Sequence, residues 1–285
     1  MPILSETLLP YAALFSTEVF TEPFLRYALF AGLLAGSVCG FLGVYVILRR
    51  IVFLGVALSE AAALGVALGL FIGGNAEAAA FGLTLVTALL FSLSGRCRGL
   101  SKESLIGWAY VVAAGVSIIL IAKNPAAEAH GLDVVSGTLL YASAKEIWQL
   151  GCVAGVVFLT FVSLHKMFIF VSFDKETARS MGLKTSFYEL CFYACLGLSI
   201  SLAMKTAGIL FVFASLLIPA MISLTLFRRM WLILIGSVLV VMLSVPAGIS
   251  LSFQADLPTG PAVVCVYAGL LVVVSAARAL YSLVR

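Results

Sequence analysis

Apolar stretches of about 20 residues recur along almost the whole chain, and this pattern decides the fold class. Such a stretch forms a helix long enough to cross a lipid bilayer. The stretches are continuously apolar rather than alternating, which argues against a β-barrel. Only 11% of the residues are charged, against about 25% in a soluble domain. We therefore expect an all-α, polytopic membrane protein with about eight or nine transmembrane helices, which form a single transmembrane domain over residues 1–285.

The apolar stretches divide into nine candidate spans, separated by short junctions that carry Arg, Lys, Pro, Gly or Asn. Residues 1–23 mix Glu and Pro with apolar residues, and we expect them to form a surface segment on the outer side, such as an interfacial helix. The predicted spans are 24–48, 51–74, 76–95, 105–122, 147–166, 187–204, 206–227, 230–252 and 261–281.

Lysine and arginine are distributed unequally between the junctions, and this predicts the orientation of the chain. One set of junctions holds 13 of the 17 basic residues, among them Arg49, Arg50 and Arg285. Cytoplasmic loops of membrane proteins are rich in Lys and Arg. With nine spans, the N-terminus then lies outside and the C-terminus inside the cytoplasmic membrane of a bacterium. The opposite junctions hold most of the acidic residues, which either attract cations from outside or keep the loops soluble.

Sequence motifs of enzymes are missing. No GxxxxGK[ST], HExxH or GxSxG pattern occurs, so the sequence offers no phosphate-binding loop, zinc-protease site or nucleophile elbow. The six cysteines show neither a disulfide framework nor zinc spacing. We expect no enzyme activity, no cofactor bound to this chain and no nucleic acid partner.

Glycine and proline predict where the helices pack and bend. Glycines four residues apart lie on one face of a helix, where they let a second helix approach closely. Pro219 lies inside an apolar span and is a candidate for a helix bend. The glycine stripes are Gly32, Gly36 and Gly40 in the first span and Gly65, Gly69 and Gly73 in the second.

Glu60 lies near the middle of the 51–74 span and is the first candidate for function. A charge at bilayer depth costs roughly 2.5–3.5 kcal/mol on insertion scales, so such residues usually face a pore, a partner or a ligand. Small residues surround Glu60 in the sequence, which leaves room for a cavity or a close helix contact. We interpret it as a cation or proton site; a structural hydrogen bond or a buried neutral acid is the alternative.

Two further carboxylates are candidates near the ends of spans. Glu189 lies close to the predicted cytoplasmic start of the 187–204 span, where it either joins an ion site or reaches the interface. Asp256 lies between two spans on the predicted outer side, in a Pro-rich and Gly-rich junction. A turn or a helix cap explains Asp256 equally well.

The longest polar cytoplasmic stretch is residues 172–186, which lie between two spans. Ser172 or Asp174 can cap a short helix there, and Gly182 can end it. A short amphipathic helix in this place suits docking onto another protein, whereas a plain connector is the simpler reading.

Taken together, four stretches resemble the permease subunit of the ABC importers for zinc, manganese and iron, and the resemblance covers nearly the whole chain. It implies the fold of such a permease, with alternating access driven by ATP that a separate subunit binds. It also implies three partners besides membrane lipid: a cytoplasmic ATPase, an extracytoplasmic metal-binding protein and a second permease copy or paralogue. The stretches are residues 45–65, 173–183, 206–220 and 256–261.

By the same resemblance, residues 174–183 are the coupling helix that docks on the ATPase, and Glu60 binds the transported metal, with Glu189 and Asp256 as helpers. The family's second helix typically carries an Asp and a His as metal ligands, four residues apart. Here those positions are Val56 and Glu60, and a carboxylate favours harder ions such as manganese or ferrous iron over zinc. The candidate coupling residues are Asp174, Glu176, Ala178 and Gly182.

Other functions stay open at this point. A secondary transporter would use Glu60 and Glu189 as proton or cation relays. A structural subunit would bury Glu60 in its neutral form, and an importer of a metal chelate would need a wider pathway.

Overall fold

The computed structural model describes residues 23–93, 101–123, 139, 142–173 and 175–283. Eight of the described helices are long and apolar enough to cross a membrane, which confirms the all-α membrane fold. The helices are α3 (Pro23–Leu48), α4 (Leu54–Ile72), α5 (Ala76–Leu93), α6 (Lys102–Ala122), α8 (Ala144–Ser163), α9 (His165–Phe173), α10 (Lys175–Ser180), α11 (Thr185–Leu226), α12 (Met230–Ala255) and α13 (Thr259–Leu283).

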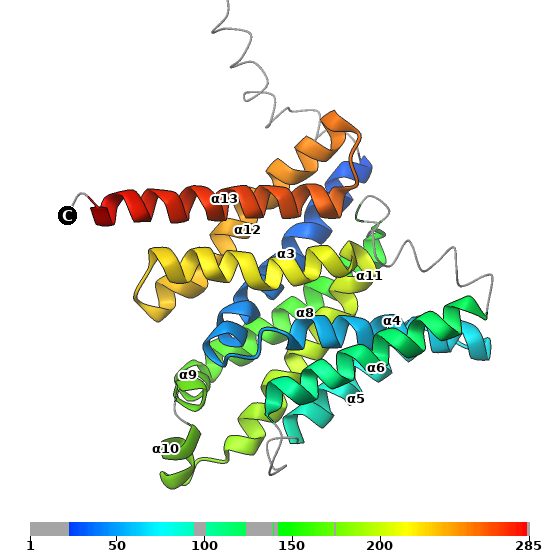
Figure 1. Ribbon diagram of the computed structural model, residues 1–285, viewed down its shortest axis with the longest axis horizontal. Helices are drawn as coiled ribbons and strands as arrows, with labels where there is room; N and C mark the ends of the chain where they lie inside the picture. Colours follow the sequence, from blue (N-terminus) through cyan, green and yellow to red (C-terminus); the bar gives the residue numbers. More distant parts are fainter. Residues whose placement is uncertain (1–22, 94–100, 124–138, 140–141, 174, 284–285) are drawn as a thin grey trace, which may run out of the picture.

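Helix α11 combines two of the predicted spans, 187–204 and 206–227. Two helical segments meet at Gly208, whose φ of 81° and ψ of 166° are not helical. Figure 1 shows the chain changing direction within α11, whose second part runs along α13. The backbone is helical at Pro219, which is buried within α11. The break within α11 therefore lies at Gly208, where only a residue without a Cβ atom adopts such angles freely, and a bend at Pro219 stays a prediction.

The helices form two groups on either side of a central pair. Helices α3 and α11 pack against each other along the middle of the molecule. Helices α4, α5 and α6 pack together on one side of this pair, and α12 and α13 lie on the other side (Figure 1). Helix α8 packs against both α3 and α11.

Glycines let neighbouring helices approach one another, as the stripes predicted. A Cβ atom on Gly36 would lie 2.7 Å from Val241 of α12, and one on Gly65 would lie 2.4 Å from the backbone of Ala80 in α5. Ordinary contact begins near 3.4 Å, so these positions accept no larger residue without movement. The last glycine of the second stripe, Gly73, instead ends α4 in a left-handed conformation.

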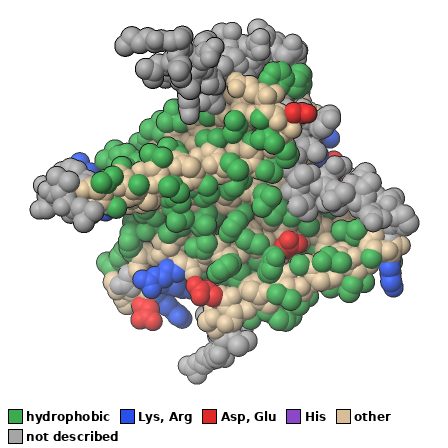
Figure 2. Space-filling view, turned by 45° about the horizontal axis from the view of Figure 1, so that its top comes forward, with side chains coloured by type: hydrophobic (Ala, Val, Ile, Leu, Met, Phe, Trp, Pro, Cys, Tyr) green, Lys and Arg blue, Asp and Glu red, His purple; other side chains and the backbone are tan. Residues whose placement is uncertain are grey.

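Three basic residues lie around Glu189 in a region here called the basic end: Arg49, Lys102 and Lys175. The opposite end contains Glu77, Glu146 and Lys205, and the ion pairs described below place these three side by side. The face drawn in Figure 2 is mostly hydrophobic, with a few acidic side chains among the apolar ones and a cluster of Lys and Arg at its lower left. The orientation predicted from the two sets of junctions stays a prediction.

Candidate functional site

Glu60 lies in the interior of α4 on a face that the chain itself leaves half open. Its side chain is half-buried, as are Val56 one turn before it and Ala63 nearly one turn after it. Among the residues that the structure describes, none forms a hydrogen bond or an ion pair with the Glu60 carboxylate. The neighbouring hydroxyl of Ser59 is already used, because it donates to the carbonyl oxygen of Gly55 at 3.0 Å. Glu60 is thus an acid at membrane depth without a partner in the described part of its own chain.

A cavity of about 810 Å³ lies on the other side of α4, between α4, α5, α8 and α11. Helix α4 contributes Ala62, Val66 and Leu70 to its wall. Successive helix residues differ by about 100°, so Glu60 and Ala62 point in nearly opposite directions. The cavity and the Glu60 face are therefore two separate features of α4.

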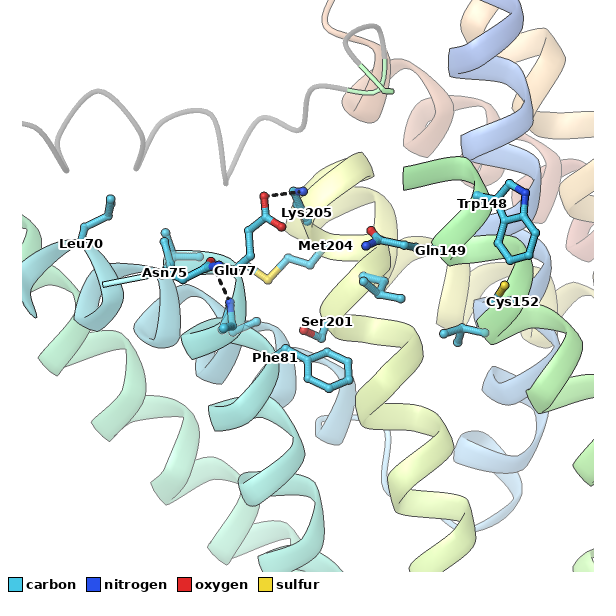
Figure 3. A pocket seen from close by; sticks show the side chains of 17 residues that line it. Leu70, Asn75, Glu77, Phe81, Trp148, Gln149, Cys152, Ser201, Met204 and Lys205 are labelled. Atoms are coloured by element: carbon cyan, nitrogen blue, oxygen red, sulfur yellow. Dashed lines mark hydrogen bonds and ion pairs between the residues drawn. The ribbon is translucent and has the colours of Figure 1, made fainter. Parts of the chain in front are cut away.

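Lys205 of α11 holds together two helix N-termini at one edge of this cavity. Its Nζ atom lies 2.8 Å from Glu77 Oε1 of α5 and 2.9 Å from Glu146 Oε1 of α8. Figure 3 shows Lys205 reaching toward Glu77, with Gln149 of α8 across from them. The Glu146 carboxylate also accepts a hydrogen bond from the backbone N–H of Ser143, which completes a capping box at the start of α8. One ammonium group thus links three helices at the opposite end.

In the sequence, Lys205 lies at the junction of the predicted spans 187–204 and 206–227, and no function was predicted for it. The sequence did contain a sign that Lys205 has partners, because it is a single cation between two apolar spans and lies three residues before Gly208. Its two carboxylate partners come from distant parts of the sequence, and no local pattern identifies them. Lys205 therefore connects α11, three residues before its break at Gly208, to the starts of α5 and α8.

Glu189 is buried at the basic end and lies between two lysines. Glu189 Oε2 accepts a hydrogen bond from Lys175 Nζ of α10 at 2.7 Å, and Glu189 Oε1 lies 3.5 Å from Lys102 Nζ of α6. The Glu189 side chain is only 9% exposed, whereas the two lysines are 38% and 40% exposed. Two ammonium groups thus occupy the positions in which a cation would meet this carboxylate.

Arg49, directly after α3, lies in the same region. Its Nε atom donates to Ser172 Oγ of α9 at 3.0 Å, and its guanidinium carbon lies 4.0 Å from the ring centroid of Phe192. Arg49 Nη2 is buried without a hydrogen-bond partner among the described residues. Burial lowers the pKa of the Arg49 guanidinium, while Tyr193 and Glu189 act in the opposite direction. The cation–π contact and the hydrogen bond hold this charge in place.

The other predicted residues lie near the ends of helices. Asp256 is exposed and ends α12 with a φ of 51°, so the structure places it in the helix-end position that was its alternative reading. In the predicted coupling segment, Glu176 is exposed, Ala178 is fully buried and Gly182 follows α10 with a φ of 83°. Asp174 lies outside the described residues.

Three acidic residues were predicted to serve the metal, and they lie in three different places. Within the described ranges, no three His, Cys, Asp or Glu side chains lie close enough together to hold a metal ion. Glu60 is half-buried without a partner among the described residues, Glu189 meets lysines and Asp256 ends a helix. A metal role for each of them stays a prediction, and a complete ligand set would need groups from outside the described residues.

Comparison with known proteins agrees with this architecture. Residues 21–278 match the ABC 3 transport family. The chain is 25% identical over 252 residues to the manganese transport system membrane protein MntC of Halalkalibacterium halodurans, which covers 88% of this chain and 86% of that protein. It is 26% identical over 252 residues to the chelated iron transport system membrane protein YfeD of Yersinia pestis, with 88% of this chain and 84% of that protein covered.

A solved structure has the same fold. PsaBC from Streptococcus pneumoniae, in complex with Fab, matches with a TM-score of 0.80 at 22% sequence identity. The match covers 91% of this chain and 94% of that chain. The order and the arrangement of the helices are therefore those of a known membrane protein fold.

Proposed function

The chain belongs to the ABC 3 transport family, and we propose that it is the membrane-spanning permease of an ATP-driven importer for divalent metal ions. Manganese, iron and zinc are the candidate ions, and the names of the two relatives support manganese and iron. The chain acts as a transporter rather than a catalyst. Its ATP is bound and hydrolysed by a separate cytoplasmic subunit.

The unpartnered Glu60 carboxylate is the observation that carries this proposal. A carboxylate in the middle of a spanning helix is costly unless it meets a cation, a proton or a partner. Because Glu60 has none of these among the described residues, a transported cation provides the missing charge. Carboxylate oxygens prefer manganese and ferrous iron to softer ions, and Val56 adds no ligand of its own.

The half-open face of α4 supports a second permease, identical or paralogous, as the partner across the pathway. Glu60, Val56 and Ala63 lie together on this face. Burying such a face against a second copy would enclose Glu60 and bring a second set of side chains near it. A single carboxylate holds an ion weakly, which suits a site that must also release its cargo.

Helix α10 offers a docking surface for the ATPase at the basic end. Ala178 is fully buried and points into the fold, whereas Glu176 and Arg179 are exposed. Phe173 and Met181, on either side of α10, are 66% and 70% exposed. An exposed polar helix between two exposed apolar side chains fits a protein partner. The basic end then faces the cytoplasm, and the opposite end receives the metal-binding protein.

A metal chelate is the second candidate for the cargo. The cavity of about 810 Å³ is far larger than a bare ion, and its wall is mainly apolar with a few polar groups, as in sites for small organic molecules. Secondary transport has less support, because Glu189 would have to leave two lysines to act as a proton relay.

Uptake of metal by cells that express the chain with its neighbouring genes tests the proposal. Cells are offered manganese, ferrous iron or zinc, each free or chelated, and wild type is compared with Glu60→Gln. We expect selective uptake of one free ion and a loss of roughly tenfold or more in the variant, since the amide lacks the charge. Glu103→Gln, at an exposed acid at the start of α6, is the control. Normal uptake in Glu60→Gln would contradict a role in the pathway, and uptake of the chelate alone would favour the second candidate.

A further inference from the structure

Helix α10 is too short to hold its own position. It has six residues, and only Ala178 among them is buried. Isolated helices of this length are unstable in water, so tertiary contacts must fix such a helix. The Lys175–Glu189 hydrogen bond, at 2.7 Å, supplies one contact at the first residue of α10.

A second contact lies just before α10. Ser172 of α9 accepts a hydrogen bond from Arg49 Nε, and Arg49 lies against Phe192 of α11. Phe192 follows Glu189 by three residues, so both contacts reach the same turn of α11. The end of α9 and the first residue of α10 therefore both connect to the start of α11.

Glu189 extends this connection to α6. Its other carboxylate oxygen lies 3.5 Å from Lys102, the first residue of α6. Helix α6 packs along α4, which carries Glu60. A buried carboxylate is costly to leave without a partner, which favours keeping both lysines next to Glu189. The order of contacts is α10, Glu189, α6 and then α4.

We propose that Glu189 is a positioning residue that transmits movement of α10 to α6 and α11, and through α6 to the helix that carries Glu60. This inference rests on the proposed function, because it requires an ATPase that moves α10. Glu189 then serves coupling rather than metal binding. Lys175 and Lys102 are its two contacts, and Arg49 keeps the approach to α10 in place.

The test uses the complete transporter, with its ATPase and its metal-binding protein, in proteoliposomes. Manganese uptake and ATP hydrolysis are measured in the same vesicles, and their ratio is the readout. For Glu189→Gln we expect the ratio to fall roughly fivefold or more, while ATP hydrolysis stays within about twofold and the ATPase still co-purifies. Lys175→Gln cuts only the contact to α10, leaves Glu189 paired with Lys102, and should lower the ratio similarly. Glu103→Gln should leave it unchanged.

Reversing the three charges distinguishes transmission of movement from α10 through Glu189 from a purely structural role of Glu189. In the triple variant K102E/K175E/E189K all three charges change sign, so both pairs can form again. We expect its ratio to return to within roughly threefold of wild type, whereas E189K alone stays low. A wild-type ratio in Lys175→Gln, or a triple variant no better than E189K, would overturn the inference. If the wild-type transporter moves no metal when ATP is supplied, the proposed function fails and the inference fails with it. If the wild-type transporter moves metal and the variants have the wild-type ratio, only the inference fails.

Discussion

Replacing Gly43 by alanine tests the packing of the two central helices. A Cβ atom on Gly43 of α3 would lie 1.7 Å from the carbonyl oxygen of Leu216 in α11 and 2.7 Å from its carbonyl carbon. Ordinary contact begins near 3.4 Å, so α3 and α11 would have to separate locally by roughly 1.7 Å. The obstructing atoms belong to the backbone, and no change of rotamer can relieve the contact.

The cost follows from two opposing effects. Overpacking typically costs about 1–3 kcal/mol, and a backbone clash of this depth belongs at the upper limit. Alanine is a better helix former than glycine by about 1 kcal/mol. The net loss is therefore about 2 kcal/mol or more, which lowers the melting temperature by roughly 4–8 °C.

Thermal unfolding of the purified protein in detergent, followed by fluorescence-detected size exclusion, measures this loss. Gly155→Ala is the matched control, because Gly155 lies in α8, is exposed and has no atom within 4 Å of the point where an added Cβ atom would lie. The control should melt at or slightly above the wild-type temperature. If Gly43→Ala also melted at the wild-type temperature, α3 and α11 would not be in contact at this place.

Two further substitutions probe the bend of α11 and the ion pairs beside it. Gly208→Ala places a side chain at a φ of 81° and a ψ of 166°, which only glycine adopts freely, and should cost about 1–3 kcal/mol; an unchanged melting temperature would contradict this. Lys205→Met removes both ion pairs at the opposite end, and because these groups are partly exposed the loss should be about 1 kcal/mol or less. Hydrogen exchange should then become faster at the starts of α5 and α8 while the rest of the chain stays unchanged, and equal exchange in both proteins would show that Lys205 does not hold them.

Local patterns predicted the helices and much of their packing. The apolar stretches coincide with the observed helices, because the length of an apolar run and the bilayer thickness decide this without tertiary information. The glycines at positions 36 and 65 pack as the stripes indicated. The stripe failed at Gly73, which shares the spacing but lies where α4 ends. Spacing identifies a face of a helix, but it does not show where the helix stops.

The candidate site was predictable only in part. Glu60 stood out because a charge inside an apolar run is rare, and the structure leaves it without a partner among the described residues. Glu189 stood out for the same reason, but its lysines are visible only in the fold. A rare charge inside an apolar run indicates that a group of opposite charge compensates it. The sequence does not show whether this group is an ion or another side chain.

The sequence by itself determined that the chain is a bundle of membrane helices and that Glu60 is a rare charge inside an apolar run. These properties follow from composition and periodicity, which act over a few neighbouring residues. Only the tertiary structure decided that α11 bends at Gly208, that Lys205 joins Glu77 and Glu146, and that Glu189 connects α10 to α6. Ion pairs act over a few ångströms in space, and folding alone brings distant segments within that range.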